Sequence, residues 1–285
     1  YQNTHWKSCR THAKSFLETY PSHDLIAAAW RYLVSSSAQL SSQEDLDQRG
    51  LKKQFVADLE KLFKQAHLFS KEELLEWQFL LAKTYYEIHD HKKAQAALEI
   101  LLKQDSFPQL GNTYLLTALL QKDQSLVQFC LYAEKALAMD ADLVEKGQVH
   151  IALFNAYLEQ SKQYPTLINQ AADHLFLAFT ILSSLQTENL DWLASYYYNL
   201  SEENSLAAER AALLLEKSAK TPTNAYKLAK LYSQKNRIEE QVALLESMKD
   251  GLDLEAKLLL AEGYVRLEKK EAAIGMDPAD LDFNY

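Results

Sequence analysis

The chain of 285 residues carries 30 basic and 39 acidic side chains, a net charge of −9. This balance disfavours a nucleic-acid-binding role, because phosphate binding draws its affinity from clustered Lys and Arg. Six Gly and five Pro provide little material for β-turns, while 48% apolar residues suffice for a continuous core. Composition therefore favours an all-helical protein. No apolar run approaches the roughly 20 residues of a membrane-spanning helix.

Apolar periodicity and capping residues predict a succession of helices. They lie near 3–19, 22–39, 49–69, 71–89, 91–104, 109–122, 124–139, 141–160, 165–186, 188–200, 203–219, 222–234, 236–249 and 252–268. Ser70 with Glu73 predicts a capping box, and Thr221-Pro222 places Pro in a first helical turn. The polar stretch 35–49 is expected to be a long turn or a fraying helix end.

One short pattern occurs three times along the chain. LAKTY at 81–85 returns as LAKLY at 228–232 and as LAEGY at 260–264, each before a second helical segment. The third copy begins 32 residues after the second. A helix–turn–helix unit repeated at this period predicts a solenoid of stacked helix pairs.

These segments resemble the tetratricopeptide repeat (TPR). In that family a small residue lets the two helices of a pair approach closely, and an aromatic residue follows one turn later. The matching small residues are Ala82, Ala229 and Ala261, and the matching aromatic residues are Tyr85, Tyr232 and Tyr264. The small residue of the second helix is matched by Ala94 and Ala273, whereas the middle copy departs with Gln241.

The resemblance covers about residues 70–274, with weaker units around Thr117, Phe154 and Tyr196. It implies an all-α fold, an α-solenoid of antiparallel helix pairs wound into a TPR-like right-handed superhelix. We expect a single elongated domain over 1–274, with its clearest repeats at about 75–104, 222–249 and 254–274. The first helix looks like the second helix of a pair, which indicates a piece of a longer protein.

Residues 275–285 (GMDPADLDFNY) break the pattern, because Gly275 and Pro278 interrupt the last second helix soon after it starts. Three explanations are open. The segment is a foreign terminal addition, or residues are missing between 274 and 275, or it is a genuine acidic–aromatic tail anchored by Phe283 and Tyr285.

In TPR proteins the first helix of each pair lines a concave groove that binds partners. The family's exposed inner positions imply a set of candidate partner-binding residues here. They are Glu76, Phe79, Lys83, Tyr86, Leu193, Tyr197, Tyr226, Lys230, Ser233, Leu258, Glu262 and Arg266. Aromatic residues beside Lys and Arg suit a groove for an extended peptide or a helix.

The function implied is a non-catalytic scaffold or adaptor that binds a peptide or helix of another protein, and self-association is compatible with it. The alternative is a regulatory or recruiting domain of a larger enzyme or of a secretion or envelope assembly factor. The Lys/Asn clamp that holds chaperone C-termini in some TPR proteins is absent, since its Asn position holds Lys83, Lys230 and Glu262. FLETYPS at 16–22 resembles a turn of bacterial envelope TPR proteins, which favours the periplasm or envelope over the cytoplasm for a bacterial source.

Catalytic motifs are missing from the sequence. It contains no Gly-rich phosphate loop, His-Glu-x-x-His, Gly-x-Ser-x-Gly or Cys-x-x-Cys. His89-Asp90-His91 lies in a predicted turn without a third ligand, so we expect a solvated turn rather than a metal site. Cys9 and Cys130 are predicted on different helices and are expected to be unpaired thiols. We therefore expect no enzyme activity, no cofactor and no metal.

Overall fold

The computed structural model describes residues 2–42, 47–139, 146–182, 185–218, 221–248 and 251–267. Over these ranges the chain forms helices joined by turns, without a β-strand. The prediction of an all-α protein made of paired helices is confirmed. The expected tail at 275–285, and Ala273, lie outside the described residues.

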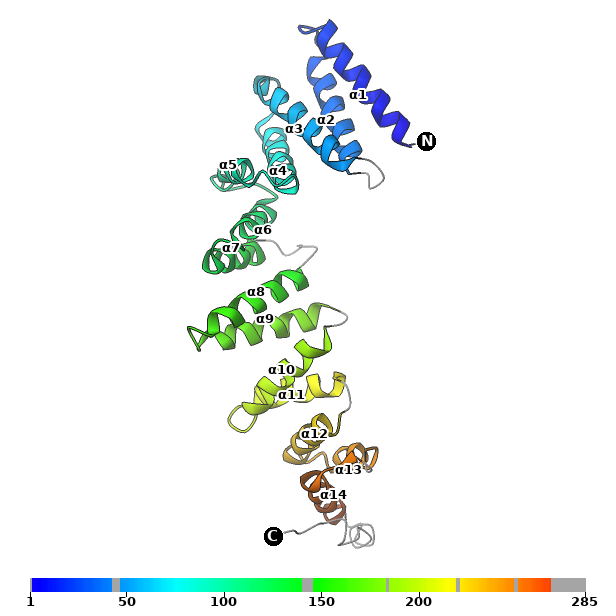
Figure 1. The fold of residues 1–285 in the computed structure, drawn as a ribbon, viewed down its shortest axis with the longest axis vertical. Coiled ribbons are helices and arrows are strands. Elements are labelled where there is room, and N and C mark those ends of the chain that lie inside the picture. The colour runs from blue at the N-terminus through cyan, green and yellow to red at the C-terminus, as the bar shows by residue number, and fades with distance from the viewer. Residues whose placement is uncertain are drawn as a thin grey trace. The chain divides into compact units, whose positions relative to one another are not determined.

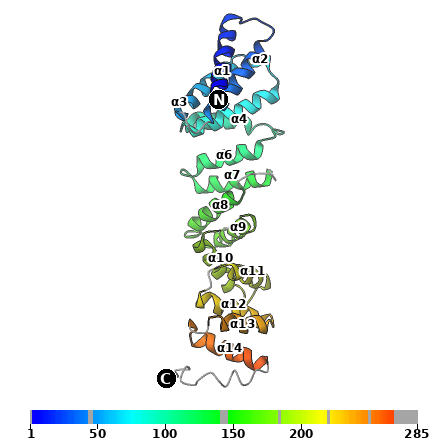
Figure 2. The same cartoon turned by 90° about the vertical axis from the view of Figure 1, so that its right-hand side faces the viewer.

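The chain divides into two compact units, residues 1–146 and 147–285, each with its own set of internal contacts. The single domain over 1–274 and the right-handed superhelix stay predictions. Within each unit, successive helices pack side by side in chain order (Figures 1 and 2).

Among its described residues, unit 1 contains seven α-helices and a short 3₁₀ helix. They are α1 (Gln2–Thr19), α2 (Ile26–Ser41), α3 (Gln48–Phe63), η1 (Ala66–Leu68), α4 (Lys71–Glu87), α5 (His91–Leu101), α6 (Leu110–Gln121) and α7 (Leu126–Met139). The most extensive contacts join α1 to α2, α4 to α5 and α6 to α7. Unit 1 thus consists of helical hairpins, as the repeat pattern predicts.

Unit 2 begins in the first turn of α8. Its described helices are α8 (Lys146–Ser161), α9 (Leu167–Ile181), α10 (Thr187–Asn199), α11 (Ser205–Lys217), α12 (Pro222–Gln234), α13 (Ile238–Glu246) and α14 (Leu254–Arg266). Here the closest pairs are α10 with α11 and α12 with α13. Each such pair has a first and a second helix, and α14 corresponds to the first helix of a further pair.

Several helix ends form as their local chemistry predicts. The backbone N–H of Glu73 donates to the Ser70 hydroxyl and the Ser70 N–H donates to the Glu73 carboxylate, both at 3.2 Å, which confirms the capping box. Thr221 caps α12 with Pro222 in the first turn. By contrast α2 continues to Ser41, so the first part of the polar stretch 35–49 is regular helix.

Small residues at the helix crossings hold the hairpins together. Ala82 and Ala94 in the α4–α5 hairpin are 0% exposed, as is Ala229 in α12. Tyr85 and Tyr232 are buried one turn later. The predicted close contact between the two helices is confirmed in both hairpins, because no solvent reaches the small side chains between them.

Candidate functional site

The structure corrects the repeat register of α10. The sequence prediction placed Tyr196 at the small-residue position that Ala229 holds in α12. In the structure this position is held by the buried Ala194, two residues earlier. Leu193 is 0% exposed and Tyr197 is 5% exposed. Both side chains belong to the core of unit 2, so their prediction as groove residues is corrected.

With this register, the inner positions of α10 are Asp191, Ser195 and Tyr198. Together with those of α12 and α14 they form one surface, which we call the first-helix face of unit 2. Its members are Asp191, Ser195 and Tyr198 on α10, Tyr226, Lys227, Lys230 and Ser233 on α12, and Glu255, Leu258, Glu262 and Arg266 on α14. The members on α10 and α12 are half-buried, and those on α14 are exposed.

Two lysines of α12 reach across to α10. The Lys227 Nζ donates to the Ser195 hydroxyl at 3.1 Å and lies 5.6 Å from the centre of the Tyr198 ring. Lys230 interacts electrostatically with the Tyr198 hydroxyl, and its Nζ is 3.5 Å from a carboxylate oxygen of Glu202. The predicted Lys230 is therefore joined by Tyr198, which the sequence missed because of the register error.

On the other side of α12, the predicted residues contact α14. Arg266 donates to the Ser233 hydroxyl at 3.0 Å and to the Asn236 side-chain oxygen at 3.1 Å. Its distance to the Glu262 carboxylate is longer, at 3.8 Å. The Glu255 carboxylate on α14 lies close enough to act on the Tyr226 hydroxyl. The structure thus brings the predicted residues of α12 and α14 together on one surface.

Burial and charge shift the ionisable groups of this face. Burial raises the pKa of Tyr198, and burial together with the neighbouring Glu255 carboxylate raises the pKa of Tyr226. Interaction with Tyr198 is the main cause that raises the pKa of Lys230, and Glu202 raises it further. At neutral pH the face presents protonated tyrosine hydroxyls beside fully charged lysine.

In unit 1, the four predicted residues lie on α4 in different environments. Glu76 and Lys83 are exposed, and Glu76 lines a cavity of about 360 Å³ beside the turn that leads to α6. Phe79 is half-buried with its ring 6.3 Å from that of Phe107, and Tyr86 stacks on His91. The two aromatic residues therefore also serve packing within unit 1.

Sequence reasoning missed a contact that recurs between successive hairpins. An acid on one second helix, a tyrosine on the next first helix and a cation at or after the following turn meet in an acid–tyrosine–cation cluster. Among the described residues, the complete clusters are Glu60–Tyr85–Lys93, Asp173–Tyr197–Arg210 and Glu216–Tyr232–Arg237. The cation lies 5.2, 5.2 and 4.2 Å from the ring centre, respectively. Each cluster ties three consecutive helices together.

The pKa of the tyrosine is raised in each cluster. Burial, with the neighbouring acid, raises the pKa of Tyr197 and of Tyr232 to about 12. The acid precedes its tyrosine by 25, 24 or 16 positions, so no fixed local spacing reveals the pair. The tyrosines themselves were predicted in two of the three clusters as repeat residues.

The described residues contain no group of three or more His, Cys, Asp and Glu side chains placed to hold a metal ion. Within the predicted turn, His89 has a left-handed backbone, Asp90 caps α5 and His91 stacks on Tyr86. None of the helices in the described ranges is long and apolar enough to cross a membrane.

Comparison with known proteins gives resemblances of structure alone. No family model and no curated protein matches the chain. Similar solved structures include a tetratricopeptide repeat protein from Parabacteroides merdae (14% identity, 98% of this chain and 87% of that chain, TM-score 0.42). Another is an IFIT1 monomeric mutant with Gppp-AAAA (14% identity, 98% of this chain and 67% of that chain, TM-score 0.35). A further one is yeast Tom70 (14% identity, 97% of this chain and 61% of that chain, TM-score 0.32). The TPR-like character of this chain rests on its own hairpins, with their buried alanines and tyrosines.

Proposed function

We propose that the chain is a non-catalytic protein-interaction scaffold that binds an acidic peptide segment of a partner on the first-helix face of unit 2. This proposal rests on the groups to which the lysine and arginine side chains of this face are bonded. Lys227 bonds to a serine hydroxyl and Arg266 to a hydroxyl and an amide oxygen, all uncharged acceptors. Such bonds fix the direction of a cation without neutralising its charge.

The two carboxylates closest to Lys230 and Arg266 neutralise these cations weakly. Glu202 is 3.5 Å from Lys230 and Glu262 is 3.8 Å from Arg266, near the outer limit of an ion pair. Their side chains are 71% and 58% exposed. Exposed pairs of this kind contribute at most about 1 kcal/mol, so a carboxylate of a bound peptide competes with them at little cost.

Apolar side chains beside the cations supply the rest of the binding surface. The rings of Tyr198 and Tyr226 are half-buried, and Leu258 on α14 is 46% exposed. Tyrosine rings next to basic groups are typical of binding hot spots, because they bury a large area at little entropic cost. We therefore expect a preferred peptide to combine acidic residues with one or two apolar anchors.

A displayed library of random peptides, selected on the full chain, tests the proposal. We expect the enriched peptides to be acidic with apolar anchors and to lose at least about tenfold in affinity on the variant Tyr226→Ala/Lys230→Glu. Tyr164→Ala/Lys162→Glu is the matched control, because it removes one tyrosine and reverses one lysine at exposed positions between α8 and α9. Equal loss in both variants, or no enrichment of acidic peptides, contradicts the proposal.

A further inference from the structure

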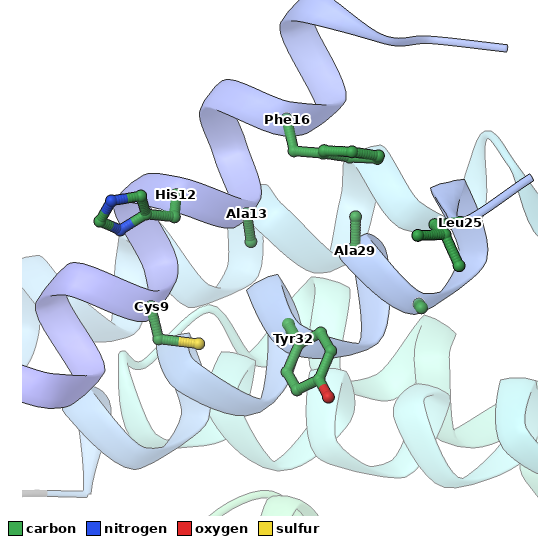
Figure 3. Close-up of a pocket in the computed structure, with 8 residues that line it drawn as sticks. Cys9, His12, Ala13, Phe16, Leu25, Ala29 and Tyr32 are labelled. Carbon is green, nitrogen blue, oxygen red and sulfur yellow. The ribbon is translucent and has the colours of Figure 1, made fainter. Parts of the chain in front are cut away.

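The apolar groove between α1 and α2 gives little chemical selectivity. Its volume is about 390 Å³, and Ala13 and Phe16 on α1 face Leu25 and Ala29 on α2 across it (Figure 3). The lining contains no Lys, Arg, Asp or Glu, so no charged group in it distinguishes one apolar ligand from another. A more selective arrangement lies on the first-helix face of unit 2, between α10 and α12.

Two lysines of α12 and two hydroxyl groups of α10 lie together at this place. Lys227 and Lys230 are three positions apart, so they share one side of their helix, and Ser195 and Tyr198 have the same spacing on α10. The Lys227 Nζ is 3.1 Å from the Ser195 hydroxyl and 5.6 Å from the centre of the Tyr198 ring. Lys230 interacts with the same tyrosine, which raises the pKa of this lysine. We call these four residues the lysine–hydroxyl site.

The lysine–hydroxyl site carries more positive charge than its neighbours neutralise. Within the described residues, Lys227 has no carboxylate partner. Glu202, in the turn after α10, is 3.5 Å from the Lys230 Nζ, and its side chain is 71% exposed. Asp191, on the same face of α10, accepts instead from the Asn224 side chain at 3.1 Å. Two lysines therefore share one loosely held carboxylate.

We propose that the lysine–hydroxyl site binds a phosphorylated side chain of the partner peptide. The proposal rests on the proposed function of this face and adds the chemical class of one ligand group. Phosphoserine or phosphothreonine carries a charge of about −1.5 to −2 and three acceptor oxygens at neutral pH, whereas aspartate carries a single charge and two oxygens. A phosphate therefore neutralises both lysines and has an oxygen left to accept from a hydroxyl.

The surroundings of the site suit a phosphate that belongs to a peptide. Burial raises the pKa of Tyr198, so its hydroxyl keeps its proton at neutral pH and remains a donor. Next to the site, the half-buried ring of Tyr226 on α12 and the exposed Leu258 on α14 offer apolar contacts. A free phosphate ion makes no use of these contacts. A peptide that lies across α10, α12 and α14 uses them together with the lysines.

An array of synthetic peptides tests the proposal. Each random flanking sequence is made with serine, aspartate or phosphoserine at one central position, and its affinity for the full chain is measured. We expect phosphoserine peptides to bind at least about tenfold more tightly than aspartate peptides with the same flanks, and serine peptides to bind most weakly. Lys227→Gln and Lys230→Gln are each expected to reduce this preference to about twofold. Lys162→Gln is the matched control that keeps it, because Lys162 is an exposed lysine between α8 and α9.

A third variant separates the phosphate site from the function of the whole face. Arg266→Gln is expected to weaken aspartate and phosphoserine peptides alike and to leave their ratio unchanged, because Arg266 lies on α14. Equal affinity for the two kinds of peptide overturns the phosphate site and leaves the acidic-peptide scaffold standing. A preference that survives both lysine variants also overturns it, because the phosphate is then bound elsewhere. Failure of all three sets of peptides to bind overturns both proposals.

Discussion

The α4–α5 hairpin of unit 1 and the α12–α13 hairpin of unit 2 have the same backbone turn with different side chains. His89 and Asn236 follow the first helix with φ of 65° and 58°, in the left-handed region. In both turns the next backbone N–H donates to the carbonyl of the repeat tyrosine, at 2.9 and 2.8 Å. This helix ending satisfies carbonyls of the last turn and directs the chain into the second helix.

The two hairpins differ immediately after that turn. Asp90 caps α5 by accepting from the Lys93 N–H, whereas Arg237 caps α13 without a side-chain bond. The buried small residue Ala94 of α5 is replaced by Gln241, which is 0% exposed and donates to the Leu259 carbonyl of α14 at 2.8 Å. The turn and the first-helix alanine–tyrosine pair are thus the common elements, while the second helix tolerates variation.

Removal of the repeat tyrosine is the change from which we expect the largest effect on these hairpins. We expect Tyr85→Ala and Tyr232→Ala each to lower the free energy of unfolding by about 3–5 kcal/mol, because each ring is buried and joins three helices. Urea denaturation followed by circular dichroism measures the change. A large loss in one hairpin with none in the other breaks the equivalence of the two hairpins.

The next largest effect is expected from enlarging the buried alanine at which the two helices of each hairpin cross. Ala82→Leu and Ala229→Leu are expected to cost about 1–3 kcal/mol each, since both side chains are fully buried between two helices. Ala96→Leu and Ala243→Leu are the controls, as these alanines are exposed on the second helices. An unchanged melting temperature for Ala229→Leu contradicts the assigned contact.

The hairpins were predictable because their determinants are local. A tyrosine three positions after a buried alanine, followed by a turn residue that tolerates positive φ, specifies each clear pair. The capping box at Ser70 was predictable for the same reason, because its two partners are three positions apart.

The α10 register was not predictable from local pattern. The sequence placed Tyr196 at the small-residue position, and the three consecutive tyrosines 196–198 give no local signal that fixes the register. Contacts distant in sequence decide among them, because Asp173 and Arg210 both meet the hydroxyl of Tyr197. This error displaced the predicted site by two positions on α10, whereas the clear repeats on α12 and α14 placed their residues on one face.

Filling a cavity tests a further difference between the hairpins. Gln78 in α4 donates to the Ala97 carbonyl, but α12 has Ala225 at the same place beside a cavity of about 270 Å³. We expect Ala225→Leu to stabilise the chain by about 0.5–2 kcal/mol, because the added methyl groups enter existing space. Thermal unfolding measures the change, with Ala96→Leu as the control, because Ala96 is exposed and does not line this cavity. A lower melting temperature for Ala225→Leu contradicts the expected fit.

The smallest expected effect concerns one hydrogen bond in each hairpin. The Tyr232 hydroxyl donates to Glu216 at 2.7 Å, and the Tyr85 hydroxyl donates to Glu60. Tyr232→Phe keeps the ring and removes only the donor, so we expect a loss of about 0.5–1.5 kcal/mol at neutral pH. Tyr85→Phe is the corresponding change in unit 1.

The pH dependence of this loss identifies the hydroxyl as its source. The native pKa of Tyr232 is raised to about 12 from an ordinary value of 10, so the folded state keeps the proton more strongly than the unfolded state. The stabilisation is therefore complete below pH 10 and disappears as the pH rises through about 12. We expect the difference in unfolding free energy between wild type and Tyr232→Phe to shrink over that interval. A difference that stays constant shows that the lost contact is one of packing, not of the tyrosine–glutamate hydrogen bond.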